Sequence, residues 1–199
     1  MGWLSPDSRL MRGLGEIADA IWINILMAFT SIPIVTVGAS LSAGYVAARR
    51  SIRGEGRVTA NYFRALRDNL PKATALWIPY LLVGAGLAYA WVILQITPLL
   101  IPKIAFSVLW AIGFEWTFAL QARLENPMGR TFVNAFIFGV GKFGWTMALA
   151  AIDAAWLGLL IASWFYFPQG LFLLVVLGYG TVTMLHVPVF ETAMRRYLR

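Results

Sequence analysis

The chain has 199 residues, of which 60% are hydrophobic and only 13% are charged, and its mean hydropathy is +0.72. Soluble domains carry about 25% charged residues, so this composition excludes a disordered chain and argues against a water-soluble single-core domain. The formal net charge is +7, and no cysteine is present, which excludes disulfides, thiol catalysis and cysteine-ligated metals. We therefore expect an integral membrane protein.

The cationic residues gather at the ends of apolar runs. Four clusters lie at 9–12, 49–72, 123–142 and 195–199. Lysine and arginine in short loops mark the cytoplasmic side of a membrane protein, so these segments and both termini are expected to be cytoplasmic. Contact with anionic inner-leaflet lipids is expected there. The same distribution argues against nucleic acid as the partner.

The first apolar segments, 17–32 and 38–52, are separated by Pro33. A proline pushes the preceding residue out of the helical region, which predicts a helical hairpin with a tight turn. Small residues at 38–44 allow close contact between its helices. Residues 38–52 either cross the membrane or form a helix that does not cross cleanly.

The segment 58–70 is of a different kind. Its apolar residues recur at helical spacing: Tyr62, Phe63, Leu66 and Leu70. Arg64 and Arg67 occupy the opposite face, which is typical of an amphipathic helix on the inner membrane surface or against a partner. Pro71 is expected to end this helix.

The rest of the chain supplies four further spans. They are predicted at 73–96, 103–122, 143–166 and 170–194, with Pro168 dividing the last two and Pro188 predicting a kink. Residues 131–140 form a second amphipathic segment on the inner side. The fold class is therefore an all-α polytopic membrane protein with about six transmembrane helices in one domain spanning 1–199.

Two inner segments align at an offset of 70 residues. Residues 62–66 fall on 132–136, and Lys72 falls on Lys142. Each copy runs from a surface helix through a lysine into a membrane hairpin. This indicates a parallel internal repeat, an arrangement found in transporters and also in other duplicated membrane proteins.

Four polar residues interrupt the apolar spans: Asn24, Glu115, Asp153 and His186. Counted along the helices, all lie on the order of 12–15 Å from the inner ends. An intramembrane carboxylate costs about 2.5–3.5 kcal/mol and needs a partner or a role. The set is either a polar pocket or proton relay, or a hydrogen-bonded structural layer. The lack of an interior lysine or arginine favours the structural interpretation.

Other chemistry is not indicated by the sequence. The spacing of Glu115, Asp153 and His186 does not support a metal site, and no nucleotide-binding, hydrolase or metalloprotease motif is present. We expect no enzyme, no cofactor and no metal. Glu191 and Arg195 are expected to pair across one helical turn.

Several motifs together resemble the YesL family, small bacterial membrane proteins of unknown function. They are Ile-Pro-Ile-Val-Thr-Val-Gly-Ala at 32–39, Arg-Gly-Glu at 53–55, Tyr-Phe-Arg-Ala-Leu at 62–66, Ala-Arg-Leu-Glu-Asn at 122–126 and Thr-Phe-Val-Asn-Ala at 131–135. The resemblance covers nearly the whole chain in order. It implies a bacterial plasma membrane location and, through genes that often stand beside it, an accessory role in carbohydrate uptake by ABC transporters.

Two functions remain open from the sequence. The first is an accessory protein that binds transporter subunits through its basic inner segments, with these inner-face contacts: Arg64, Arg67, Arg123, Glu125 and Asn126. The second is a small autonomous transporter or channel that uses Glu115, Asp153 and His186 as its polar path. The sequence favours the first, because the membrane part shows no convincing substrate path.

Overall fold

The computed structural model describes residues 9–195 and 197, without the side chain of Arg9. Within this part the chain forms seven α-helices and two 3₁₀ turns and no strand, which confirms the all-α prediction. The elements are α1 (Arg9–Thr30), η1 (Ile34–Thr36), α2 (Val37–Ile52), α3 (Val58–Val92), η2 (Thr97–Leu99), α4 (Leu100–Gln121), α5 (Met128–Gly141), α6 (Phe143–Tyr166) and α7 (Pro168–Met194). Arg196 and Arg199 of the last predicted basic cluster lie outside the described residues.

Five helices are long and apolar enough to cross a membrane. They are Leu10–Thr30, Val58–Val92, Thr97–Gln121, Phe143–Tyr166 and Pro168–Met194. α2 is not among them, because it has only 16 residues and a bilayer core needs about 20 apolar ones. The polytopic class is confirmed, and the crossing of 38–52 stays a prediction.

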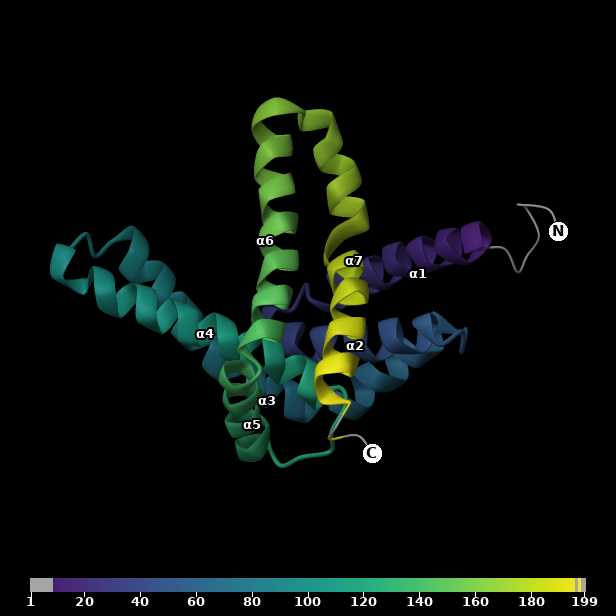
Figure 1. The fold of residues 1–199 in the computed structure, drawn as a ribbon, viewed down its shortest axis with the longest axis horizontal. Helices are drawn as coiled ribbons and strands as arrows, with labels where there is room; N and C mark the ends of the chain where they lie inside the picture. Colours follow the sequence, from purple (N-terminus) through teal and green to yellow (C-terminus); the bar gives the residue numbers. More distant parts are fainter. Residues whose placement is uncertain (1–8, 196, 198–199) are drawn as a thin grey trace.

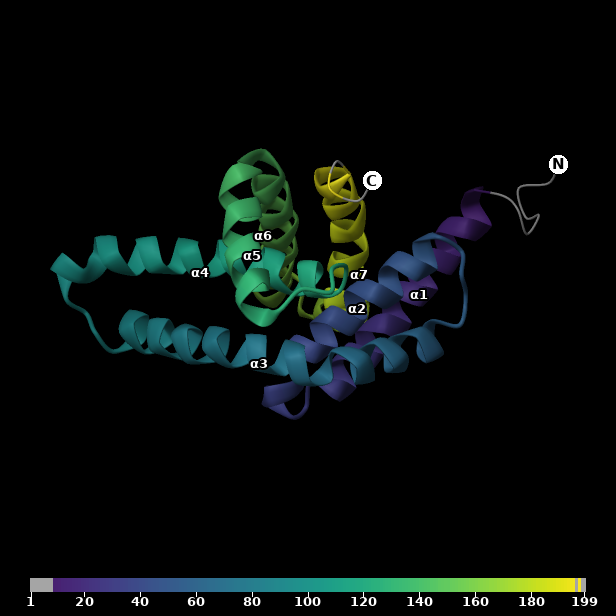
Figure 2. The ribbon, with the colours of Figure 1, turned by 90° about the horizontal axis from the view of Figure 1, so that it is seen from below.

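Two long hairpins extend from a common centre in different directions (Figure 1). One is formed by the second half of α3 with α4, and the other by α6 with α7. α1, α2 and the first half of α3 lie together on the remaining side, as the view from below also shows (Figure 2). α2 packs against α1, α3, α4 and α7 and is the most enclosed helix of the fold.

The small residues of α2 allow this enclosure. A Cβ on Gly38 would lie 2.5 Å from the Ala73 carbonyl oxygen and 2.6 Å from the Trp77 Cβ. Ser40 lies 2.9 Å from the Tyr62 hydroxyl, which also lies 2.6 Å from the Thr30 hydroxyl. Close helix contact at 38–44 is therefore confirmed, and α1, α2 and α3 share one buried hydroxyl cluster.

The expectation that Pro71 ends the surface helix is wrong. α3 continues through Pro71 and Pro79 to Val92. Buried residues of α3 lie on both sides of Pro71, including Tyr62 and Trp77, while Pro71 itself is exposed. Packing along one continuous face therefore outweighs the loss of a single backbone hydrogen bond on the other face.

The two copies of the predicted repeat differ at the aligned lysines. Lys72 lies within the uninterrupted α3, whereas the chain turns at Lys142, where φ is −113° and ψ is 42°. The second amphipathic segment is therefore a separate helix, α5, followed by α6. The parallel repeat stays a prediction.

Candidate functional sites

Three of the four predicted intramembrane polar residues come together. Glu115 comes from α4, Asp153 from α6 and His186 from α7. His186 Nε2 lies 3.7 Å from Asp153 Oδ1, and His186 Nδ1 lies 3.9 Å from Glu115 Oε2. One ligand atom from each residue lies within 4.8 Å of the others. We call these three residues the polar cluster.

Tyr45 of α2 completes the cluster on one side. Its hydroxyl lies 3.0 Å from His186 Nδ1, and the two rings stack with their centroids 6.4 Å apart. Tyr179 of α7 adds an edge-on contact to the same imidazole. Sequence reasoning missed Tyr45, because a tyrosine in a small-residue helix gives no signal of its contact 141 positions away.

The polar cluster is largely enclosed, and its carboxylates have no lysine or arginine partner among the described residues. The His186 side chain is completely buried, and those of Glu115 and Asp153 are 11% and 20% exposed. His186 Nε2 and Glu115 Oε2 are buried without a hydrogen-bond partner. Among the described residues, the ion-pair contacts of both carboxylates are with His186 rather than with lysine or arginine. Such an arrangement suits a proton or a bound cation.

Asn24, the fourth predicted member, does not join the cluster. α7 breaks at Gly178, where φ is 51° and ψ is −166°, rather than at the predicted Pro188. Asn24 Nδ2 of α1 donates to the carbonyls of Val175 at 3.0 Å and Val176 at 3.1 Å. In an unbroken helix those carbonyls would accept from residues 179 and 180, so the Asn24 amide replaces partners that the break removes.

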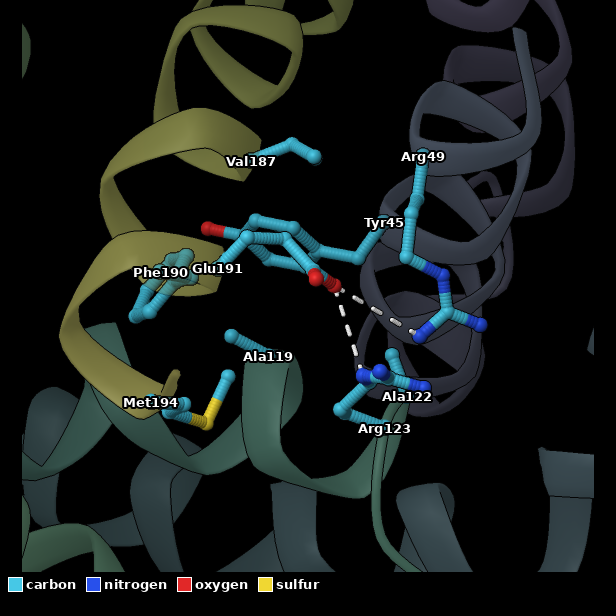
Figure 3. A pocket seen from close by; sticks show the side chains of 9 residues that line it. All are labelled: Tyr45, Arg49, Ala119, Ala122, Arg123, Val187, Phe190, Glu191 and Met194. Carbon is cyan, nitrogen blue, oxygen red and sulfur yellow. Dashed lines mark ion pairs between the residues drawn. The ribbon is translucent and has the colours of Figure 1, made fainter. Parts of the chain in front are cut away.

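Near the C-terminal end of α7, Glu191 lies close to three arginines, and Figure 3 shows two of them, Arg49 and Arg123. Glu191 lies 3.3 Å from Arg123 Nε, 3.4 Å from Arg53 Nη2 and 4.0 Å from Arg49 Nη1. The expectation that Glu191 pairs with Arg195 is therefore wrong, since closer arginines from α2 and the α4–α5 loop surround it. A cavity of about 20 Å³, room for about one water, lies between Glu191 and Tyr45.

A larger groove lies beside these ion pairs, between α2, α3 and the end of α4. Its volume is about 380 Å³. Five cationic side chains line it: Arg49, Arg50, Arg64, Lys72 and Arg123. The acidic residues in its lining are Asp68 and Glu125. We call this feature the basic groove.

The basic groove contains three of the five predicted inner-face contacts. Arg64, Arg123 and Glu125 line it, and Arg123 is also tied to Glu191. Arg67 is exposed on α3 outside the groove lining, and Asn126 is half-buried in the α4–α5 loop. Among the five cations that line the groove, Arg49, Arg50 and Arg123 each form an ion pair with a described acidic residue. Arg64 and Lys72 form none with a described residue.

Residues 20–91 match the model of a family described as "Protein of unknown function, DUF624". The match covers less than half of the chain. YesL-like proteins are members of DUF624, so the match confirms the resemblance over these residues. The matched residues supply Tyr45 and the α2 and α3 walls of the basic groove. No curated protein and no solved structure matches the chain.

Proposed function

We propose that the protein is a membrane accessory protein that associates with a bacterial transporter, of the carbohydrate ABC uptake class. In this proposal the basic groove receives an acidic cytoplasmic segment of a transporter subunit. The observation that carries the proposal is a groove of about 380 Å³ lined by five cations, two of which have no acidic partner among the described residues.

The basic groove has a partly fixed shape. Arg50 donates to Asn61 Oδ1 at 2.7 Å and lies 3.6 Å from Glu55. Gln121 donates to Asn69 Oδ1 at 3.1 Å, which holds the end of α4 against α3. Arg64 and Lys72 stand on that ordered base with exposed side chains. Cations exposed on such a base favour an acidic partner and repel a basic one.

The class of transporter rests on the resemblance to YesL-like proteins rather than on the groove. The positive-inside pattern supports a cytoplasmic position for the groove, because its cations belong to the clusters at 49–72 and 123–142. In that position the groove faces the cytoplasmic loops and subunits of a membrane transporter, and its cations favour an acidic segment among them. Anionic lipid headgroups are the competing occupants.

Charge reversal tests this assignment. The double variant Arg64→Glu with Lys72→Glu should recover about tenfold less transporter when the tagged protein is purified in mild detergent from its host, a loss of roughly 1.4 kcal/mol. Arg130→Glu is the matched control, because Arg130 is an exposed arginine of α5 that does not line the groove. Equal recovery from all three proteins would contradict docking at the groove.

A second candidate is a small autonomous transporter or channel. The convergence of Glu115, Asp153 and His186 supports it, as does the small cavity that both Glu191 and Tyr45 line. Asp153→Asn should then abolish proton flux into proteoliposomes that contain a pH-sensitive dye, while the variant remains folded. Equal proton flux into vesicles with wild type, with the variant and without protein would contradict a transporter or channel function.

A further inference from the structure

We propose that Glu115, Asp153 and His186 bind one divalent transition-metal ion inside the helical bundle. The three ligands come from three different helices, α4, α6 and α7. A bound ion therefore links these helices. The site is separate from the basic groove and requires neither docking nor transport.

The geometry is close to that of a metal site. Ligand bonds of about 2.0–2.2 Å place two donors of one ion roughly 3–4 Å apart. His186 Nε2 and Asp153 Oδ1 are 3.7 Å apart, and one ligand atom from each of the three residues lies within 4.8 Å of the others. Glu115 Oε2 lies 3.9 Å from His186 Nδ1, so Glu115 must move toward Nε2 for the three residues to share one ion.

The burial and hydrogen bonding of the His186 imidazole leave its Nε2 atom available to bind a metal ion. Its side chain is completely buried, and Nε2 has no hydrogen-bond partner. Nδ1 lies 3.0 Å from the Tyr45 hydroxyl. When Nδ1–H donates to that oxygen, the lone pair of Nε2 points toward Asp153. Metal-binding histidines are commonly held in this way through their other nitrogen, which makes Tyr45 a positioning residue.

The negative charge of the Glu115 and Asp153 carboxylates also favours a bound metal ion. Two carboxylates in an apolar interior need positive charge, and among the described residues neither is paired with lysine or arginine. One divalent ion neutralises both. A nitrogen and two oxygens suit Zn²⁺, Fe²⁺ or Mn²⁺, whereas Ca²⁺ and Mg²⁺ prefer oxygen alone.

Metal content of the purified protein tests the proposal. The chain is prepared in detergent with a tag free of histidine, loaded separately with Mn²⁺, Co²⁺ or Zn²⁺, desalted and analysed by mass spectrometry. Wild type should retain about one ion per chain. Asp153→Asn and His186→Gln should bind at least about tenfold more weakly. Glu16→Gln, which removes an exposed carboxylate of α1 outside both sites, should match wild type.

The visible spectrum of the Co²⁺ form supplies a measurement that does not depend on variants. An intense visible band should appear in wild type, because Co²⁺ bound by few ligands, including a nitrogen, absorbs strongly. Co²⁺ bound loosely at the surface remains hydrated and absorbs only weakly. If the wild-type protein retains none of the three metals, the proposal is overturned. The carboxyl groups of the polar cluster are then neutralised by bound protons. Retention that is unchanged in both folded variants would overturn it as well.

Discussion

At the scale of single residues, a few polar side chains connect helices that lie far apart in the sequence. Tyr45 reaches His186, and Glu191 reaches arginines on two other segments. The sequence predicted the polar cluster because charge inside an apolar span is unusual. It could not predict Tyr45 or the Glu191 ion pairs, since those depend on how the helices pack and not on local spacing.

Asn24 gives a prediction at this scale. In Asn24→Ala the carbonyls of Val175 and Val176 lose their amide donor beside the Gly178 break. Inside an apolar membrane span no water replaces the lost donor, and an acceptor left without a partner costs about 1–3 kcal/mol, so we expect a lower thermal unfolding temperature in detergent. Thr192→Ala on the same helix, where the hydroxyl is exposed, is the control. An unfolding temperature equal to that of wild type would show that Asn24 does not stabilise the break.

At the scale of helices, periodicity and proline rules predicted most elements but not their ends. The turn at Pro33 is confirmed by the end of α1 at Thr30 and the 3₁₀ turn at Ile34–Thr36. Pro71 misled the prediction, because local rules do not include the packing of α3 on α2 and α4. The break at Gly178 was missed for a related reason: it depends on the close approach of Asn24 from α1.

Gly38 tests the packing of α2. In Gly38→Ala the new methyl group would meet the Ala73 carbonyl oxygen at 2.5 Å, and this backbone cannot move without shifting α3. Overpacking of this kind costs about 1–3 kcal/mol. Gly158→Ala, with nothing within 4 Å of the new Cβ, should leave stability equal or slightly raised. Thermal unfolding in detergent compares the two, and similar unfolding temperatures would argue against tight packing around α2.

At the scale of the whole molecule, charge divides the protein into an apolar part and a basic end. Both hairpins expose apolar side chains along their length, whereas the arginines gather where α2, α3 and α4 meet. Composition predicted this division, and the resemblance agrees with the family match over residues 20–91. The basic groove itself was not predicted, because it arises from segments that lie far apart in the sequence.

Topology can be measured directly because the chain has no cysteine. Single cysteines at Ser31, Gln95 and Glu125 would report on three connections between helices. From the positive-inside pattern we expect an impermeant maleimide to label Ser31→Cys and Gln95→Cys in intact cells, and Glu125→Cys only after permeabilisation. Labelling of Gln95→Cys without Ser31→Cys would show that α2 does not complete a crossing.

Contact between the basic groove and a transporter is tested most directly by a photo-crosslinking amino acid placed at the position of Arg64 in living cells, with the position of Arg130 as the control. We expect a covalent adduct with a transporter subunit from the Arg64 position and little from the Arg130 position. Adducts with lipid alone, or equal adducts from both positions, would contradict it.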